Sequence, residues 1–334
     1  MIQKPYLLYL GDANDELSIK LARGVLTWDK DACIAEWSRP NASATLNLPH
    51  MTPEDAVAAG AKTLVVGLVN SGGTVPVTWV SDLENAVLAG LDIAAGMHVE
   101  LATLGDLRAL ADKHGRTLHE LRRPQRSYAT ASGVKRTGKR VLTVGTDCSV
   151  GKMFTSVALT REMEHRNLLA KFCATGQTGT LVAGEGIAVD AIVGDFMSGA
   201  VESLCPSTGR DAWQIVEGQG SLFHPAFAGV TLGLLHGSQP DCFIVCHEPT
   251  RTKMRGVDHP MPTLKQVVDA TLLHGALTNP DIKLAGFSIN TSKIDATAAK
   301  SYLSDIETEF GVPATDPIRF GVTGLVDALQ KQAR

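Results

Sequence analysis

The stretch Val141–Thr155, VLTVGTDCSVGKMFT, constrains the fold more than any other part of the chain. A β-branched run ends at Gly145, a loop follows that closes on Gly151 and Lys152, and a helical pattern begins near Met153. This order is typical of a phosphate-binding loop, in which backbone N–H groups and a helix N-terminus face an anion and a lysine adds its charge. The stretch therefore predicts a strand, an anion-binding loop and a helix in succession.

The loop departs from the common pattern G-x-x-x-x-G-K-[ST] in two respects. Five residues separate its glycines, namely Thr146, Asp147, Cys148, Ser149 and Val150. Met153 stands where a serine or threonine hydroxyl usually holds Mg²⁺, and Thr155 lies two residues further on. We therefore expect residues 145–153 to bind phosphates, whereas the pattern gives less support to nucleotide hydrolysis.

From Val141 onward, apolar strand patterns alternate with helical patterns. Strands are expected at Val141–Val144, Ala170–Ala174, Gln214–Val216, Cys242–Cys246, Leu284–Ile289 and Ile318–Phe320. Helices are expected at Lys152–His165, Ala188–Leu204, Leu264–Leu277, Ala296–Phe310 and Thr323–Lys331. This alternation predicts a parallel sheet covered on both faces, with its ligand crevice beyond the carboxyl ends of the strands.

A smaller α/β pattern precedes it. Strands are expected at Tyr6–Leu10, Cys33–Trp37 and Thr63–Val69, with helices at Asn14–Leu26, Val80–Ala89 and Leu104–His114. The glycine-rich turn at residues 70–73 follows the third strand but lacks G-x-G-x-x-G, so it is interpreted as a topological turn, with a nucleotide site as the alternative. The basic, polar stretch Leu121–Arg140 is either a solvated linker or a clamp for ligand phosphates. We predict an N-terminal domain at residues 1–125, a linker at 126–140 and a larger domain at 141–334.

Composition sets wider bounds. The chain has 334 residues, of which 44% are hydrophobic and 20% charged, enough for two domains with separate cores. Its net charge is −4, with 31 basic and 35 acidic residues, which gives no reason to expect a nucleic acid or an anionic membrane as a partner. No apolar run approaches the roughly 20 residues that span a bilayer, and no signal peptide is evident, so we expect a cytoplasmic protein.

Six cysteines without a secretory signal indicate reduced thiols rather than a disulfide framework. Cys242 and Cys246 lie in the strand-like run CFIVC and are interpreted as core residues. Cys148 lies inside the loop, where amides and Lys152 would lower its pKa. It is therefore a candidate reactive thiol, with a residue selected for its size as the alternative.

Polar side chains follow four of the expected strands. The loop with Asp147 and Lys152 follows the first, residues 175–180 the second, EGQGS at Glu217–Ser221 the third, and HEPTRTKMR at His247–Arg255 the fourth. Each alone can be a turn, a helix cap or a solvated charge run. Because the carboxyl ends of parallel strands meet at one edge of a sheet, together they predict a functional site.

These same stretches resemble known proteins. GTDCSVGK and EGQGS are similar to the GTD-x-x-VGK and EG-x-G motifs of dethiobiotin synthetase-like P-loop proteins. The longer set GTDCSVGKMFTSVAL, KFCATGQTG, EGQGSLFHPAFAG and HEPTRTKMRG resembles the D-glutamate N-acetyltransferase family, formerly a family of unknown function, over essentially the whole chain. The resemblance implies a small N-terminal Rossmann-like α/β domain and a larger P-loop NTPase-like domain with a mostly parallel sheet. It also implies acetyl transfer from acetyl-CoA to the amine of D-glutamate, ahead of an oxidative step by a partner dehydrogenase in D-amino-acid catabolism.

Acetyl transfer to an amine needs a base, donors for the tetrahedral oxyanion and cations for the substrate carboxylates. Asp147 and Glu217 are the first candidates for the base because each directly follows a strand, and His224, His247 and Glu248 are further candidates. Arginines grip carboxylates bidentately, which suits an acidic amino acid. The expected substrate-binding residues are Gln177, Thr178, Gln219, Ser221, Glu248, Arg251 and Arg255.

Two other functions remain open at this point. In the first, Asp147 and Glu217 hold Mg²⁺ in an ATP-dependent enzyme of the dethiobiotin synthetase type that acts on an acidic small molecule. In the second, the protein is a non-catalytic nucleotide-binding sensor. For the transferase we expect acetyl-CoA and an acidic amino acid as ligands, no metal requirement and a homo-oligomer.

Overall fold

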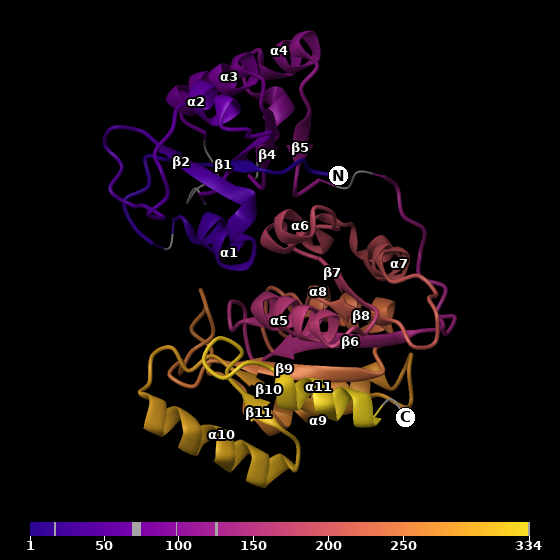
Figure 1. Ribbon diagram of the computed structural model, residues 1–334. Coiled ribbons are helices and arrows are strands. Elements are labelled where there is room, and N and C mark those ends of the chain that lie inside the picture. The colour runs from indigo at the N-terminus through magenta and orange to yellow at the C-terminus, as the bar shows by residue number, and fades with distance from the viewer. Residues whose placement is uncertain (17, 69–74, 98, 124–125, 333–334) are drawn as a thin grey trace. The chain divides into compact units, whose positions relative to one another are not determined.

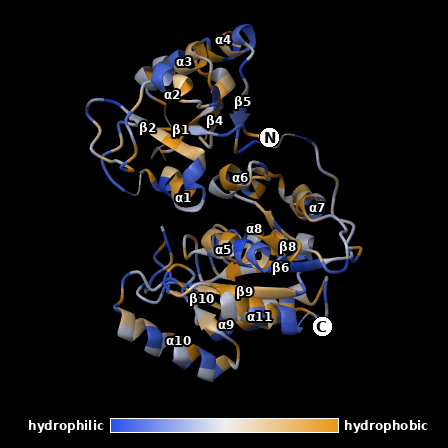
Figure 2. Ribbon diagram, in the orientation of Figure 1, coloured by the Kyte–Doolittle hydropathy of each residue, from blue (hydrophilic) through white to orange (hydrophobic). Residues whose placement is uncertain are grey.

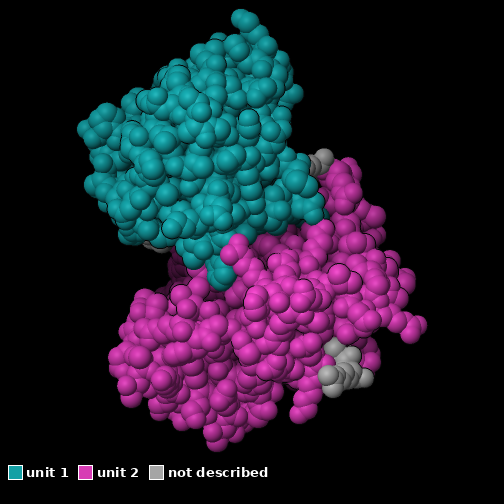
Figure 3. Space-filling model, in the orientation of Figure 1, with its two compact units in different colours: residues 1–124, 176–188 teal, residues 125–175, 189–334 magenta. Residues whose placement is uncertain are grey.

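The computed structural model describes residues 1–16, 18–68, 75–97, 99–123 and 126–332. It forms two compact units (Figure 1, Figure 3). Unit 1 comprises Met1–Pro124 and Gly176–Ala188, and unit 2 comprises Gln125–Thr175 and Val189–Arg334. The glycine-rich turn at 70–73 lies outside the described residues. Among the helices of the described ranges, none has the length and apolar character needed to cross a membrane.

Unit 1 is built on a parallel sheet with the strand order β2-β1-β3-β4-β5 over its described residues. The strands are β1 (Tyr6–Gly11), β2 (Cys33–Ser38), β3 (Thr63–Val66), β4 (Asp92–Ala95) and β5 (Leu118–Glu120). The helices are α1 (Lys20–Trp28), α2 (Pro53–Ala58), α3 (Val77–Ala89), α4 (Leu107–His114) and α6 (Gln177–Ala183).

Alternation along β1 supplies both faces of this sheet. Leu7 and Tyr9 point to a core shared with α2, α3 and α4, whereas Leu8 and Leu10 point to a core shared with α1 and α6. Helix α6 comes from far along the chain, and its Leu181 is fully buried in the second core. Both faces of the sheet are therefore covered, which explains why β1 is buried along its whole length.

Unit 2 contains a second parallel sheet, with the described strands in the order β11-β10-β9-β6-β8-β7. The strands are β6 (Lys139–Gly145), β7 (Ala170–Cys173), β8 (Trp213–Val216), β9 (Cys242–His247), β10 (Lys283–Ile289) and β11 (Ala314–Thr315). The helices are α5 (Lys152–His165), α7 (Gly194–Leu204), α8 (Ala228–Ser238), α9 (Leu264–Gly275), α10 (Ala296–Phe310) and α11 (Thr323–Gln332). Strand β9 is buried along its length, and Figure 2 shows it mainly in hydrophobic colours.

Strand β6 positions the phosphate loop. It lies between β8 and β9, and the chain continues from it to β7 on one side and returns to β9 on the other. The carboxyl ends of β6, β8 and β9 therefore meet where the strand order reverses, which is the usual ligand crevice of an open α/β sheet. The two α/β parts and their parallel sheets confirm the expected fold class.

Some expected elements differ. Ile318–Phe320 is a turn rather than a strand, because the Asp316 carboxylate accepts hydrogen bonds from the backbone N–H groups of Ile318 and Arg319; β11 lies earlier, at Ala314–Thr315. The helix expected from Ala188 begins at Gly194, after a short 3₁₀ turn. Helices α6 and α8 have no counterpart among the expected helices, and α6 begins within the polar stretch at residues 175–180.

Candidate functional site

The loop between β6 and α5 is folded tightly against its neighbours. A Cβ atom on Gly145 would lie 2.8 Å from Val150 Cγ2 and 3.0 Å from the Cys246 carbonyl oxygen, so no larger residue fits there. Gly151 adopts φ +106°, a left-handed backbone that favours glycine, and α5 begins at the next residue. The loop therefore presents the N-terminus of a 14-residue helix, as an anion site requires.

Lys152 is buried within this loop. Its Nζ donates a hydrogen bond to the Asp147 carbonyl oxygen at 2.7 Å, and its side chain packs against Gly218, where a Cβ would lie 3.0 Å from Lys152 Cδ. Burial lowers the pKa of Lys152, against the opposing effect of neighbours that include Asp147 and Glu217. The carbonyl oxygen that accepts this hydrogen bond is neutral. A phosphate bound at the loop would add a negative charge next to the Lys152 amine.

The magnesium position is altered in the structure as well as in the sequence. Met153 is half-buried in the first turn of α5. The Thr155 hydroxyl donates to the Gly151 carbonyl oxygen at 2.9 Å and lies 2.7 Å from Ser288 Oγ, so it is engaged with the sheet beneath the loop. Neither residue supplies a magnesium-binding hydroxyl at the loop.

Asp147 holds the segment after β9 onto the loop. Its Oδ1 accepts from the Cys148 N–H at 2.7 Å, and its Oδ2 accepts from both Arg251 Nη1 and the Arg255 N–H at 2.7 Å. The carboxylate is fully buried. It is thus paired with a guanidinium and two backbone amides, the pattern of a carboxylate that fixes a loop.

The side chains of Arg251 and Arg255 both contact the phosphate loop. Arg251 also donates to the carbonyl oxygens of Cys148, at 2.7 Å, and Ser149, at 3.2 Å. The Arg255 guanidinium donates to the Ser149 hydroxyl. These contacts place two cations where an anion on the loop would meet them, and their expected role towards substrate carboxylates stays a prediction.

His224 holds the same segment from the other side. Its Nδ1 accepts from the Ala226 N–H at 3.2 Å, so its Nε2 carries the proton and donates to the Arg255 carbonyl oxygen at 3.0 Å. Its ring packs on Phe227, with centroids 4.5 Å apart. Asp147 therefore fixes the backbone N–H of Arg255, and His224 fixes its backbone C=O.

A metal ion fits this cluster poorly. Ligand atoms of Asp147, Cys148 and His224 lie within 4.8 Å of one another, a spacing that can hold a metal. However, the carboxylate of Asp147 is bound by Arg251 and by backbone amides, and His224 Nδ1 already accepts a hydrogen bond. Burial also raises the pKa of Cys148, outweighing Lys152, so the expectation of a lowered pKa for this thiol was wrong.

Glu217 closes β8 in a different environment. Its Oε2 accepts from the Thr175 N–H at 2.9 Å, and its Oε1 accepts from Gln219 Nε2 at 3.2 Å. Thr175 also donates from its hydroxyl to the Glu217 carbonyl oxygen at 2.7 Å. Ser221 Oγ donates to the Thr146 carbonyl oxygen at 3.1 Å and so ties this loop to the phosphate loop. Thr175 belongs to the expected strand-end stretch 175–180, but it was not among the expected substrate-binding residues.

His247 ends β9, and Glu248 follows it directly. Glu248 accepts from the Thr250 N–H at 2.9 Å and lies 3.3 Å from Lys293 Nζ and 3.6 Å from Arg251 Nε. Burial raises its pKa, but hydrogen bonds from Thr250 and Lys293 outweigh this and hold the pKa below its ordinary value. Burial lowers the pKa of His247 to about 4, and its Nδ1 lies 2.9 Å from Thr146 Oγ1.

Gln177 and Thr178 belong to unit 1, unlike the other expected site residues. They begin α6, and the Gln177 side chain lies against Gly96, where a Cβ would come within 1.9 Å of Gln177 Oε1. Their expected role in substrate binding stays a prediction.

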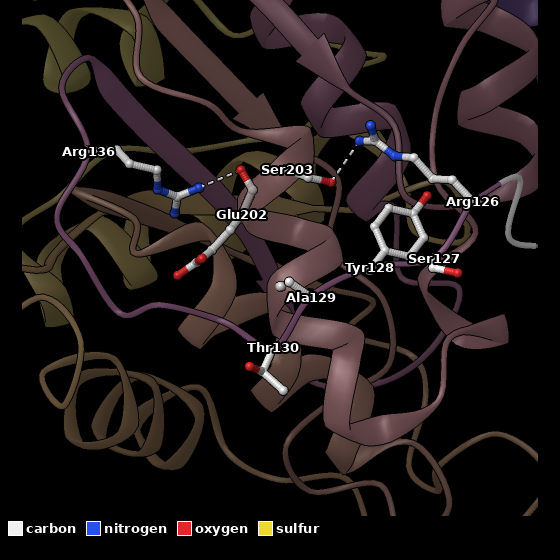
Figure 4. A pocket seen from close by; sticks show the side chains of 9 residues that line it. Arg126, Ser127, Tyr128, Ala129, Thr130, Arg136, Glu202 and Ser203 are labelled. Carbon is white, nitrogen blue, oxygen red and sulfur yellow. Dashed lines mark hydrogen bonds between the residues drawn. The ribbon is translucent and has the colours of Figure 1, made fainter.

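The basic stretch before β6 binds protein groups. Arg136 donates to the carbonyl oxygens of Glu202, at 2.8 Å, and Cys205, at 2.6 Å, and also to that of Gly237. Arg136 and Arg140 therefore do not act as a phosphate clamp, because Arg140 likewise donates to backbone carbonyls. Figure 4 shows the hollow that this stretch forms beside α7, of about 390 Å³, where Arg126 donates to Ser203 Oγ at 3.1 Å. Its lining shares no residue with the strand-end loops.

Comparison with known proteins places this geometry in a family. Residues 127–326 match the model described as "Domain of unknown function (DUF1611_C) P-loop domain", and residues 39–124 match "Domain of unknown function (DUF1611_N) Rossmann-like domain". A protein of Tritonibacter scottomollicae named D-glutamate N-acetyltransferase is 48% identical over 98% of this chain and 99% of its own length. A second protein of that name, from a Pseudoalteromonas species, is 44% identical over 97% of this chain and 98% of its own length.

A solved structure agrees over both parts. The crystal structure of a DUF1611 family protein from Anabaena variabilis is 31% identical, has a TM-score of 0.88, and covers 98% of this chain and 100% of its own. The Rossmann-like and P-loop domains of that family correspond to the two α/β parts described above. The chain belongs to the DUF1611 family.

Proposed function

We propose that this protein is an N-acetyltransferase that moves the acetyl group of acetyl-CoA to the amine of an acidic amino acid, with D-glutamate as the first candidate. Two relatives with 48% and 44% identity, matched over nearly their whole length, carry the name D-glutamate N-acetyltransferase. The observation in the structure that supports the proposal best is the phosphate loop, which keeps its lysine and helix N-terminus but has Met153 at the magnesium position.

This loop suits a phosphate-bearing acyl carrier. Acetyl-CoA needs its phosphates to be bound but not hydrolysed, so the loss of the magnesium hydroxyl removes nothing that the transfer requires. Lys152, the first turn of α5 and the guanidinium groups of Arg251 and Arg255 provide the positive charge. ATP-dependent chemistry is less well served, because Asp147 is paired with Arg251 at 2.7 Å.

We assign the role of general base to Glu217. The amine nitrogen attacks the thioester carbonyl carbon, the C–S bond breaks, and the ammonium proton must pass to a base before attack. Both carboxylate oxygens of Asp147 already accept hydrogen bonds, from Arg251 and from two backbone N–H groups, so its role is to hold the loop. Glu217 accepts hydrogen bonds from the Thr175 amide and from Gln219 at the end of β8, next to Lys152. His224 is instead a positioning residue, since it fixes the Arg255 carbonyl group.

The remaining expectations follow from this proposal. Gln219 Nε2 and the N–H groups of the loop at Glu217–Ser221 are candidates for stabilising the oxyanion. An N-acetylated product protects the amine, which suits a role in D-amino-acid catabolism before an oxidative step. We also propose that the enzyme acts as a cytoplasmic homo-oligomer that needs no metal.

The test is release of free coenzyme A. The full chain is mixed with acetyl-CoA and D-glutamate, and thiol is followed with a disulfide reagent, with L-glutamate, D-aspartate and no amino acid as controls. We expect release that depends on an acidic amino acid and is highest with D-glutamate. No release across this panel, together with magnesium-dependent loss of ATP, would replace the proposal by the ATP-dependent alternative, and binding without turnover would favour the sensor.

Two variants test the assignment of the base. Glu217→Gln keeps the size of the side chain and an oxygen that can accept the hydrogen bond from the Thr175 N–H, but it removes the base. We therefore expect kcat to fall by about 10²- to 10⁴-fold with little change in KM. Asp147→Asn loosens the segment held by Arg251 and Arg255, so we expect mainly a higher KM for acetyl-CoA. Loss of kcat in Asp147→Asn with normal activity in Glu217→Gln would reverse the two assignments.

A further inference from the structure

The loop after β8 contains two buried backbone N–H groups that do not pair with the protein. Ser221 is fully buried, and Gly220 is buried beside it. Among the described residues, none accepts a hydrogen bond from the N–H of either one. Buried backbone N–H groups are nearly always paired, so an unpaired pair indicates a functional role. These two groups are called the N–H pair below.

The earlier donors of the same loop are already in use. The Glu217 N–H donates to the Cys173 carbonyl oxygen at 3.1 Å, and the Gly218 N–H donates to the Thr143 hydroxyl oxygen at 2.9 Å. The side-chain amide of Gln219 donates to Glu217 Oε1 at 3.2 Å, and its backbone N–H belongs to a partly exposed residue that water can reach. The N–H pair is therefore the buried donor set that this loop can offer to a ligand oxygen.

Helix α8 fixes the direction of the N–H pair. The buried Thr231 hydroxyl donates to the Gln219 carbonyl oxygen at 2.7 Å. Because a trans peptide is planar, with its C=O and N–H groups on opposite sides, the Gly220 N–H points away from α8. Gly220 has φ +67°, and a Cβ on it would lie 2.5 Å from the Phe227 carbonyl oxygen, so only glycine fits. Successive N–H groups at such a left-handed residue can converge on one anion.

The N–H pair is tied to both parts of the proposed site. Ser221 Oγ donates to the carbonyl oxygen of Thr146, in the phosphate loop, at 3.1 Å. Glu217, the proposed base, lies three residues before Gly220 in the same loop. The pair thus lies in the chain between the base and the contact with the loop that would bind the phosphates of acetyl-CoA.

We propose that the N–H pair of Gly220 and Ser221 is the oxyanion hole of the acetyl transfer and that Thr231 is its positioning residue. This inference rests on the proposed function. Glu217 first takes one proton from the ammonium group. The amine nitrogen then bonds to the thioester carbon, and the π electrons of the C=O bond move to the oxygen, which accepts hydrogen bonds from the N–H pair.

The second half of the step restores the carbonyl group. The electron pair on the oxygen re-forms the C=O bond, the C–S bond breaks, and the thiolate of coenzyme A takes the excess proton of the nitrogen. Two neutral N–H donors suit a single oxygen whose charge exists only in the tetrahedral intermediate. The carboxylates of an acidic amino acid are better served by the guanidinium groups of Arg251 and Arg255.

The experiment compares two substitutions of the positioning residue in the full chain. Thr231→Val keeps the shape of the side chain but removes the hydroxyl, so the peptide between Gln219 and Gly220 is no longer held. Loss of a whole oxyanion donor costs about 10²- to 10³-fold in kcat, so we expect a fall of about ten- to hundredfold for this loss of orientation, with little change in either KM. Thr231→Ser keeps the hydroxyl and should restore most of kcat.

Thr271 provides a matched control on α9. It is also fully buried, and its hydroxyl donates to the Val267 carbonyl oxygen at 2.7 Å. Thr271→Val therefore loses a hydrogen bond of the same kind away from the loop after β8. We expect it to keep the kcat of the wild type, even where urea unfolding shows a loss of stability similar to that of Thr231→Val.

The outcomes separate this inference from the proposed function. A wild type that releases no coenzyme A with any acidic amino acid would refute the function, and the oxyanion hole with it. An active wild type with an unchanged kcat in Thr231→Val would refute the oxyanion hole alone. A higher KM for D-glutamate at the wild-type kcat would overturn it in favour of a carboxylate subsite. An equal fall of kcat in Thr231→Ser or in Thr271→Val would show that Thr231 has only a structural role.

Discussion

Lys152 is a buried amine whose Nζ donates a hydrogen bond to the Asp147 carbonyl oxygen of its own loop. We predict that Lys152→Met weakens the binding of acetyl-CoA by about ten- to hundredfold, because hydrogen bonds to a charged group contribute about 1.5–3 kcal/mol. The melting temperature should stay the same or rise, since the substitution removes a charge whose burial is unfavourable. Calorimetric titration with acetyl-CoA and a thermal melt measure the two effects. Unchanged affinity would show that the cofactor binds elsewhere.

His247 predicts a pH dependence of stability. Burial holds its pKa at about 4, against an ordinary value of 6.5, so the unfolded chain binds a proton in this range more readily than the folded protein does. The unfolding free energy that neutral His247 contributes is fully present above pH 6.5 and is lost as the pH falls towards 4. Between pH 7 and pH 5 we expect the loss of about 2 kcal/mol of unfolding free energy from this residue.

The variant His247→Gln isolates this effect. Glutamine does not titrate and can keep a hydrogen bond to Thr146, so urea unfolding of the variant should depend less on pH than that of the wild type. Identical pH profiles for the two proteins would show that burial does not lower the pKa of His247.

At the level of residues, the sequence predicts position better than partnership. Asp147 and Glu217 were found because each follows a strand, and the structure places both beside Lys152. The partner of Asp147 is Arg251, more than a hundred residues away, and this pairing depends on the path of a whole loop. The pKa of Cys148 depends on burial, which outweighs the nearby cations and which a sequence pattern does not report.

Helix α8 carries a graded set of glycines along its contact with α7. At Gly237 a Cβ would lie 2.4 Å from the Ser198 carbonyl oxygen, at Gly233 it would meet the flexible end of Met197 at 2.6 Å, and at Gly229 it would meet nothing within 4 Å. We predict that Gly237→Ala destabilises unit 2 by about 1–3 kcal/mol through overpacking. Gly229→Ala should be neutral or stabilising by up to about 1 kcal/mol, because alanine favours a helix.

Gly233→Ala should fall between these two, since the Met197 side chain can move aside. The order is measured by urea unfolding of the three variants. Equal effects at Gly229 and Gly237 would mean that the two helices do not approach as closely as described.

The same glycines explain why α8 escaped prediction. Three glycines lower its helix propensity, and its apolar residues lie on several sides, so no helical period stands out. Helix α6 has only seven residues and includes a glycine and β-branched positions. By contrast, α5 and α10 are long and were predicted with their bounds at or near the observed ones.

For the whole molecule, the alternation of strands and helices predicted the parallel sheet of unit 2 and the α/β character of unit 1, because this pattern is local. The path of Gly176–Ala188 could not be predicted in the same way. This segment follows β7 of unit 2 in sequence, yet α6 packs with α1 and buries Leu181 in the core of unit 1. Its membership is decided by tertiary contacts that no sequence period encodes.

This path predicts how unit 1 behaves in isolation. A fragment of residues 1–124 lacks α6, so it exposes the apolar surface that Leu181 covers and loses the bond from Tyr6 Oη to the Leu181 carbonyl oxygen. The Ile2 N–H lies 3.2 Å from the Gly184 carbonyl oxygen, so residues 176–188 can be joined to Met1 through a short glycine-serine linker. We expect this fusion to melt cooperatively and at a higher temperature than the 1–124 fragment, which should aggregate or unfold broadly. Leu181→Asp in the fusion should remove the gain, because a carboxylate cannot be buried there without a partner. Equal melting of the fragment and the fusion would show that α6 is dispensable for unit 1.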